Sequence, residues 1–262
     1  MDLDLTGKHA LVCGASQGIG RAVAMELAGM GASVTVLARR ADKLKALLDE
    51  LPEAPGQLPH HHIALDGSDL DALRRAMQDL AKRAPVHILI NNSGGPPPGP
   101  ILAADIGAFE TAVRAHLLAN QVRAQELIPG MREAGFGRIV NIISTSVKEP
   151  IPGIGVSNAT RGAVASWAKT LAGEVAADGI TVNNVLPGST ETPRIEQIIA
   201  ARARSGEADE DAVRASMTSS IPLGRFAEPA ETAAAVAFLC SPAAAAITGV
   251  NLPVDGGRTR SL

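Results

Sequence analysis

The sequence predicts an α/β protein in which one parallel sheet is covered by helices on both faces. Short apolar runs alternate with longer segments of helical period along the 262 residues, as expected when strands and helices follow one another. The apolar runs are rich in Val, Ile and Leu, which is typical of strands buried on both faces. Hydrophobic residues make up 46% of the chain and charged residues 19%, enough apolar material for one sizeable core.

Each apolar run is assigned to a strand and each longer periodic segment to a helix. The predicted strands span residues 8–13, 32–38, 62–66, 86–91, 137–144, 180–186 and 247–254. The predicted helices span residues 18–30, 41–50, 69–83, 105–134, 154–178 and 229–240. No linker-like stretch divides the chain, so residues 1–262 are expected to form a single doubly wound domain.

The stretch 190–220 interrupts this alternation with two short amphipathic segments. Their apolar positions are Ile195, Ile198, Ile199, Val213 and Met217. A long excursion of this kind in a compact domain is usually functional. We therefore expect a lid over a substrate pocket, and its Ile and Met content indicates a small substrate with an apolar portion.

Charge and cysteine usage exclude several classes of function. The net charge is −3 and no basic face is clustered, so neither nucleic acid nor an acidic membrane is expected as a partner. Cys13 and Cys240 lie in an apolar strand and a helix, and residues 1–4 lack the start of a secretory signal, which indicates the reducing cytoplasm. Strand alternation would split the tract His60–His62 between two faces, so no metal site is expected.

A glycine pattern follows the first predicted strand and opens the first helix. Gly14, Gly18 and Gly20 permit a tight turn, a close backbone approach to a pyrophosphate, and close packing of helix on strand. The N–H groups at the helix N-terminus then face the anion. The turn predicts a dinucleotide site that also includes Ser16, Gln17 and Ile19; the alternative is a glycine turn that serves packing only.

The end of the second predicted strand indicates which dinucleotide binds. No carboxylate stands in Ser33–Ala38 to hold the ribose hydroxyls of NAD, and Arg39 and Arg40 follow at once. An arginine fork suits the 2′-phosphate of NADP. NADP(H) is therefore predicted over NAD(H), the alternative being that both arginines are merely solvated at a helix start.

Several runs together resemble the short-chain dehydrogenase/reductase family, a Rossmann-type fold, with a general likeness to bacterial β-ketoacyl carrier-protein reductases. They are the glycine turn, Asn91–Gly94, Gly137–Ser144, Asn183–Gly188 and Ile247–Gly257. The resemblance implies that Asp66 contacts the adenine amine, that Asn92 and Gly94 line the cofactor cleft, and that Ser144 hydrogen-bonds the substrate oxygen. It also implies that Pro187, Gly188 and Thr192 border the nicotinamide. Cys13 departs from the family's usual Thr.

The departures from the family concentrate at the catalytic positions. The family's Tyr, thirteen residues after the Ser, falls on Ser157, and its Lys, four residues further, falls on Arg161. The chain contains no tyrosine, so no change of alignment restores the phenol. The family's Asn on the fourth helix falls on His116. Three of the four catalytic positions have changed.

Reduction of a carbonyl needs a proton at its oxygen, and an aliphatic hydroxyl is a poor donor beside a phenol. Ser157 therefore replaces the phenol poorly. His116 would relay a proton through water to Ser144 or Ser157 if it pointed into the cleft. Arg161 would hydrogen-bond the nicotinamide ribose or bind a substrate carboxylate, since its guanidinium gives up no proton. Lys148 and Glu149 are alternative acids.

Three functional classes remain open on this basis. The first is an NADP(H)-dependent oxidoreductase acting on a small carbonyl compound or alcohol by a non-standard proton route. The second is a catalytically inactive dinucleotide-binding protein that acts by sensing or assembly. The third makes Ser144 a nucleophile activated by His116, although no orienting carboxylate is evident. The resemblance also implies a homodimer or homotetramer, formed through the Ala-rich faces around 108–128 and 159–177.

Overall fold

The computed structural model describes residues 1–53, 58–204, 206 and 209–261 and confirms the predicted fold class. Seven strands form one parallel sheet in the order β3-β2-β1-β4-β5-β6-β7. They are β1 His9–Cys13, β2 Ser33–Ala38, β3 His61–Ala64, β4 Ile88–Asn91, β5 Gly137–Ile142, β6 Ile180–Pro187 and β7 Asn251–Val254. Every predicted strand is present.

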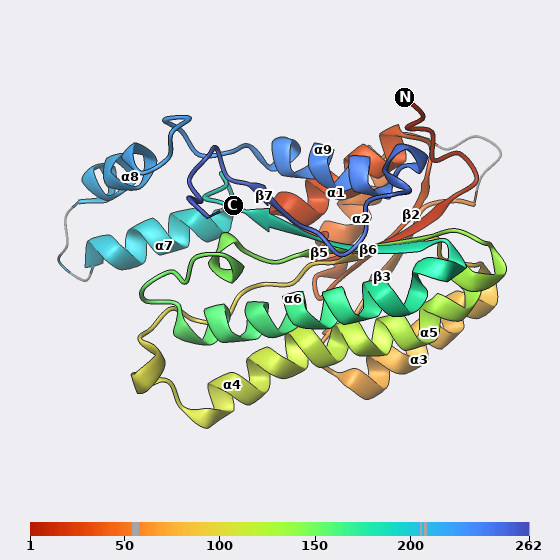
Figure 1. Ribbon diagram of the computed structural model, residues 1–262, viewed down its shortest axis with the longest axis horizontal. Coiled ribbons are helices and arrows are strands. Elements are labelled where there is room, and N and C mark those ends of the chain that lie inside the picture. Colours follow the sequence, from red (N-terminus) through yellow and green to blue (C-terminus); the bar gives the residue numbers. More distant parts are fainter. Residues whose placement is uncertain (54–57, 205, 207–208, 262) are drawn as a thin grey trace.

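Helices cover both faces of the sheet, as Figure 1 shows. One face carries α1 Gly18–Gly29, α2 Ala41–Glu50 and α9 Pro229–Cys240, and the other carries α3 Leu70–Arg83, α5 Ala119–Glu133 and α6 Gly155–Val175. Strand residues divide between the two cores by alternation: Val12 packs with α1 and α9, whereas Leu11 packs with α3 and α5. Side chains of β1 therefore contribute to both cores.

The segment predicted as one helix over 105–134 is divided into three parts. They are α4 Ile106–Val113, the π-helical turn η2 Arg114–Leu118, and α5. A π-helical turn inserts one extra residue into the helix and is common at functional sites. The predicted helix is therefore present over this range, but it carries a π-helical turn at His116 that the sequence did not predict.

An amide ladder crosses the sheet at one register. Asn91, Asn141, Asn184 and Asn251 pair on adjacent strands β4 to β7. Each amide donates to the oxygen of the next, over 2.9, 2.9 and 2.8 Å. Because hydrogen bonds in a chain polarise one another, the ladder stiffens the sheet beside the edge where the cofactor cleft lies.

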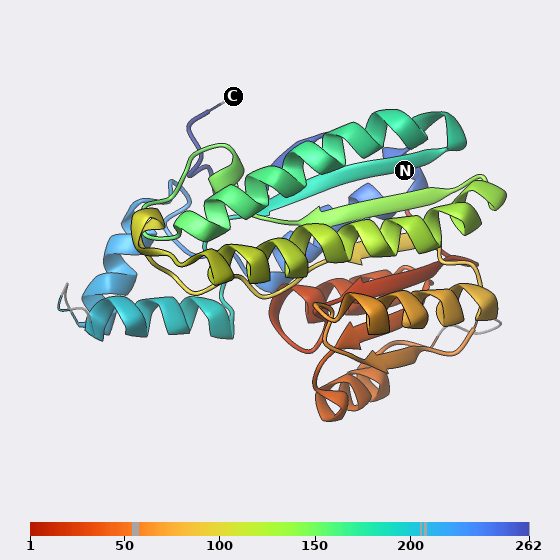
Figure 2. The same cartoon turned by 90° about the horizontal axis from the view of Figure 1, so that it is seen from below.

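The 190–220 stretch forms α7 Pro193–Arg204 and α8 Glu210–Ser219. Ile195, Ile199 and Val213 are buried in one small cluster with Ile198 and Met217 packed against it, as their spacing predicts. Figure 2 shows α7 and α8 at the end of the molecule toward which the strands run. No helix of the described residues is long and apolar enough to span a membrane.

Candidate functional site

A cleft of about 1240 Å³ lies at the carboxyl edge of the sheet, where parallel α/β sheets bind ligands. The loops after β1 to β6 line it, together with the first turns of α6 and α7. All but two of the predicted site residues line this cleft. They are Gly14, Ser16, Gln17, Gly18, Ile19, Arg39, Arg40, Asp66, Asn92, Gly94, Ser144, Ser157, Arg161, Pro187, Gly188 and Thr192. Gly20 and His116 lie just outside it.

The glycine turn leaves no room for a side chain at Gly14 or Gly20. Gly14 has φ +62°, and a Cβ there would lie 2.7 Å from Asn92 Nδ2. Gly20 serves packing: its Cβ would fall on the Gly14 carbonyl oxygen and 2.6 Å from the same amide. Asn92 Nδ2 in turn donates to the Gly14 carbonyl at 3.3 Å. The turn is thus held open toward the cleft by backbone and one amide.

The adenosine end of the cleft carries the residues expected to select NADP(H). Arg40 Nη2 donates to Gln17 Oε1 at 2.7 Å, so this guanidinium is turned toward the glycine turn. Arg39 is also exposed and lines the cleft, while β2 ends on Ala38 without a carboxylate. A 2′-phosphate fits this arrangement better than a ribose diol.

Asp66, which is predicted to contact the adenine amine, stabilises a turn after β3. Its Oδ1 accepts the Ser68 N–H at 3.0 Å and the Ser68 hydroxyl at 2.7 Å, which closes a turn after β3. These two hydrogen bonds lower the pKa of the Asp66 carboxyl, with a smaller contribution from the charge of Arg39. The ionised carboxylate still lines the cleft and can accept a hydrogen bond from an amine.

Arg123 is a cleft residue that the sequence did not reveal. Only 3% of its surface is exposed, and its Nη1 donates to Asn91 Oδ1 at 3.3 Å and to Asn120 Oδ1 at 3.1 Å. It therefore caps the acceptor end of the amide ladder. Its Nε–H is buried without a partner. The recurrence of Asn on four strands was the available signal for this network.

The part of the cleft that contains the predicted catalytic residues Ser144, Ser157 and Arg161 is called the reaction end. Arg161 is buried there, with 8% of its surface exposed. Its Nη1 donates to the Ile142 carbonyl at 3.2 Å and its Nη2 to the Ser93 carbonyl at 3.3 Å, which ties α6 to the ends of β5 and β4. Burial, with the nearby charge of Arg194, lowers the pKa of Arg161 to about 10. The guanidinium thus stays protonated at neutral pH.

The two serines line the same end. Ser157 precedes Arg161 by one turn of α6, so both lie on one face of the helix. Ser144 follows β5 and caps a short 3₁₀ turn, where its Oγ accepts the Ser146 N–H at 3.1 Å. Because the Oγ acts as an acceptor there, the hydroxyl hydrogen of Ser144 remains available to donate a hydrogen bond.

His116 reaches the cleft only through Ser93. The ring is 2% exposed, and its Nδ1 lies 2.6 Å from Ser93 Oγ. Burial lowers the pKa of His116 to about 3, assisted by the charges of Arg161 and Arg123. The ring is therefore neutral at neutral pH and bonded to a cleft-lining residue, whose carbonyl also accepts from Arg161.

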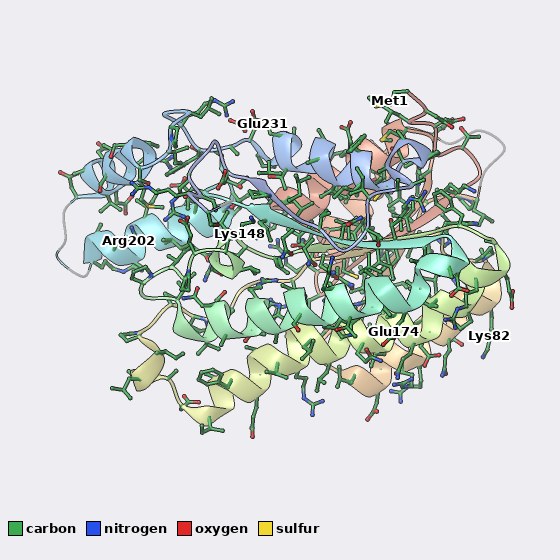
Figure 3. All side chains as sticks on the ribbon, viewed as in Figure 1. Met1, Lys82, Lys148, Glu174, Arg202 and Glu231 are labelled. Carbon is green, nitrogen blue, oxygen red and sulfur yellow. The ribbon has the colours of Figure 1, made fainter. Side chains whose placement is uncertain are left out.

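The structure also gives contacts or positions for the alternative acids Lys148 and Glu149 and for the histidine tract His60–His62. Glu149 Oε1 accepts the backbone N–H groups of Arg260 and Ser261 at 2.6 and 2.9 Å, so it ties down the C-terminal segment. Lys148, beside it, lies on the loop between β5 and α6 (Figure 3). Neither lines the cleft. His60 in the histidine tract bonds the Val34 N–H and lies 2.8 Å from the Pro52 carbonyl.

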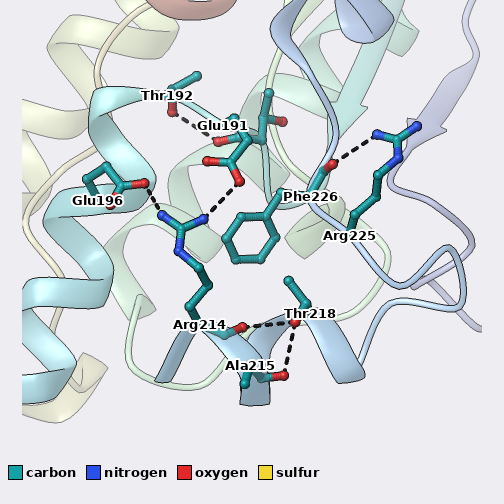
Figure 4. Close-up of polar contacts among 9 residues, drawn as sticks. Glu191, Thr192, Glu196, Arg214, Ala215, Thr218, Arg225 and Phe226 are labelled. Carbon is teal, nitrogen blue, oxygen red and sulfur yellow. Dashed lines mark hydrogen bonds and ion pairs between the residues drawn. The ribbon is translucent and has the colours of Figure 1, made fainter. Parts of the chain in front are cut away.

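An ion-pair network holds the α7–α8 segment together. Arg214 on α8 donates to Glu191 at 2.8 Å and to Glu196, and its guanidinium lies 5.3 Å from the centre of the Phe226 ring (Figure 4). Thr192 Oγ1 donates to the Thr190 carbonyl at 3.2 Å. Arg194, in the first turn of α7, donates to the Pro96 carbonyl at 3.0 Å and lines the cleft.

The comparisons place the chain among known reductases and dehydrogenases. A family profile described as enoyl-(acyl carrier protein) reductase matches residues 14–259. The chain is 35% identical over 259 residues to 4-formylbenzenesulfonate dehydrogenase TsaC1/TsaC2 of Comamonas testosteroni, covering 98% of this chain and 99% of that protein. It is 33% identical over 258 residues to 3-oxoacyl-(acyl-carrier-protein) reductase FabG of Vibrio harveyi, covering 97% and 98%.

A solved structure agrees with the sequence comparisons. The crystal structure of L-sorbose reductase from Gluconobacter frateurii, complexed with NADPH and L-sorbose, superposes with a TM-score of 0.93. The two chains are 31% identical, and the match covers 100% of each. Fold and chain length therefore coincide along the whole molecule.

Proposed function

Because the chain belongs to the short-chain dehydrogenase/reductase family, we propose that it reduces a small carbonyl compound, or oxidises an alcohol, by a non-standard proton route. The predictions of an oxidoreductase and of NADP(H) as its cofactor are confirmed by these relatives. The observation that carries the rest is that Ser144, Ser157 and Arg161 line the same cleft as the glycine turn.

The residues present fit NADP(H). We propose that the glycine turn with Ser16, Gln17 and Ile19 holds the pyrophosphate at the N-terminus of α1, where free N–H groups favour an anion. Arg39 and Arg40 would hold the 2′-phosphate and Asp66 the adenine. Around the nicotinamide would stand Asn92, Gly94, Pro187, Gly188, Thr192 and Arg161. When bound, the cofactor supplies or accepts the hydride.

The chain's own residues must orient the carbonyl oxygen of the substrate and supply its proton. Ser144 donates a hydrogen bond to the carbonyl oxygen, since its other side already accepts from Ser146. Arg161 stabilises the charge that develops on that oxygen but keeps its own proton. We propose that water, ordered by Ser157, delivers the proton, and that His116 acts by orienting Ser93. His116 is a positioning residue in this scheme.

One observation favours the alternative of a dinucleotide-binding protein without turnover. No Tyr, Lys, His or Glu lines the described cleft, and its one Asp has a lowered pKa while burial raises that of the Cys13 thiol. No group there titrates near neutral pH, so proton transfer has no efficient donor. The hydrolase reading loses its basis because His116 bonds Ser93 rather than Ser144.

The test is NADPH oxidation across a panel of small aldehydes and ketones, with NADPH binding measured separately. Slow turnover that falls further in Ser144→Ala, at unchanged NADPH affinity, is the expected result. Binding of NADPH without turnover on any panel member supports the binding-protein alternative. We also propose the homodimer or homotetramer formed by the Ala-rich faces of α4 to α6, which sedimentation tests directly.

A further inference from the structure

The reaction end of the cleft holds two positive charges without a negative one. Arg161 and Arg194 both line it, and they donate to the carbonyls of Ser93 and Pro96 in the same loop after β4. Among the described residues neither takes part in an ion pair. The only acidic residue that lines the described cleft is Asp66, after β3 at the adenosine end.

Both guanidinium groups are oriented but not neutralised. Arg161 donates to two backbone carbonyls and Arg194 to one, which leaves several N–H donors on each group. Carbonyl dipoles fix the direction of a guanidinium without cancelling its charge. A buried cation without a counter-ion is costly, and an anion arriving in the cleft relieves that cost.

Arg194 also stands where a basic residue is disfavoured. It occupies the first turn of α7, and the positive end of a helix dipole repels a cation there. Its hydrogen bond to the Pro96 carbonyl joins α7 to the loop after β4 across the cleft. The same helix end attracts an anion, so an anion beside Arg194 would be favoured by both charges and by the dipole.

Apolar side chains also line the cleft, alongside polar ones such as Thr111 and Gln197. Ile154, Ile195 and Ile198 line the cleft beside the two arginines, with Ala115 on the α4–α5 side. A ligand that fills this end therefore has a charged group and a short apolar group. Carboxylates suit guanidinium groups because paired N–H donors match their two oxygens.

Resting on the proposed function, we propose that Arg161 and Arg194 bind the carboxylate of an oxo-acid substrate with an apolar side chain. Ser144 then contacts the carbonyl oxygen of the same molecule. Arg194 becomes a substrate-recognition residue, carried into place by the first turn of α7.

Binding to the NADPH-saturated protein tests this without requiring turnover. The probes are 4-methyl-2-oxopentanoate, its methyl ester, and a phosphonate of the same chain length, each titrated by calorimetry. Arg194→Gln is compared with Arg204→Gln, which removes the same charge from the exposed end of α7 outside the cleft. We expect Arg194→Gln to weaken oxo-acid binding by about tenfold or more. The Arg204→Gln variant should bind as the wild type does, and Arg194→Lys should recover part of the loss.

Three outcomes overturn the proposal. The first is that the methyl ester binds as well as the acid, the second is that the phosphonate binds more tightly than the carboxylate, and the third is that the loss in Arg194→Gln falls on NADPH affinity. The last result would assign Arg194 to the cofactor phosphates. Oxo-acid binding that depends on Arg194, without NADPH oxidation, would instead leave this inference standing and refute turnover.

Discussion

The two ends of the cleft are built in opposite ways. At the adenosine end the backbone of the glycine turn and the exposed Arg39 and Arg40 face the ligand. At the reaction end Arg161 and His116 are buried and bonded through Ser93. The first end depends on the shape of a backbone turn, whereas the second depends on buried side chains, at the positions where the sequence predicts a departure from the family pattern. Shape and chemistry can thus change independently within one cleft.

The largest effect is expected from restoring the phenol at the reaction end. Ser157→Tyr places an acid one helical turn before Arg161, whose charge lowers the pKa of a neighbouring phenol. A positioned acid contributes about 10²–10⁴ in rate, so kcat for carbonyl reduction should rise by that order. NADPH oxidation on the best panel substrate measures it.

Ser157→Phe is the matched control, since it adds the ring without the hydroxyl. Equal rates in the Tyr and Phe variants would show that proton delivery does not limit the reaction, and the comparison between the two ends would lose its chemical basis. A gain confined to the Tyr variant would show that proton delivery limits the reaction and would support the comparison between the two ends.

The free energy of unfolding at acid pH depends on the protonation of His116. Its pKa falls from 6.5 to about 3 on folding, so between these values the unfolded chain binds a proton that the folded chain does not. Stability from this ring is fully present above pH 6.5 and is lost as the pH falls toward 3, by at most roughly 5 kcal/mol. His116→Asn introduces the residue that the family resemblance implies at this position. It should make the free energy of unfolding less dependent on pH in this acid range.

Urea unfolding between about pH 7.5 and about pH 5 measures the slope. His87→Gln is the comparison: the pKa of His87 is lowered to about 4, mainly by burial, but this ring lies away from the cleft. His87→Gln should also make the free energy of unfolding less dependent on pH, but without changing NADPH oxidation. A slope unchanged in His116→Asn would mean that the ring is not buried in neutral form.

The residues predicted for the cofactor end all line the cleft except Gly20, because they lie in local motifs that follow directly after strands. The five inner strands were found for a similar reason, since a parallel strand buried on both faces is typically a continuous apolar run, whereas the edge strands β3 and β7 are partly exposed. The π-helical turn was missed because one inserted residue hardly changes an apolar pattern. Arg123 and Arg194 were missed because their partners, Asn91 and the Pro96 carbonyl, are distant in the chain.

At the cofactor end, packing at Gly20 is expected to matter more than any single charge. Gly20→Ala forces a methyl group onto the Gly14 carbonyl and Asn92, neither of which can move without distorting the turn. Overpacking of this kind costs about 1–3 kcal/mol or more, and NADPH affinity should fall with it. Thermal unfolding and NADPH titration measure the two effects.

Gly29→Ala is the control on the same helix, because a Cβ at Gly29 meets nothing within 4 Å. This variant should keep wild-type NADPH affinity and unfold at the same or a slightly higher temperature. Comparable losses in both variants would show that α1 is sensitive to any added methyl group, and the shape argument for the turn would fail.

An effect of similar size to that of Gly20→Ala, but confined to one cofactor, should come from the exposed arginines. Replacing both Arg39 and Arg40 by Gln removes charge-assisted hydrogen bonds to a 2′-phosphate, worth about 1.5–3 kcal/mol, or about 10- to 100-fold in the Kd for NADPH. The Kd for NADH should stay constant, because NADH lacks that phosphate. Arg75→Gln, exposed on α3 and outside the cleft, controls for net charge. Equal weakening of NADPH and NADH would mean that the arginines act on the pyrophosphate, and that selectivity at this end comes from shape alone.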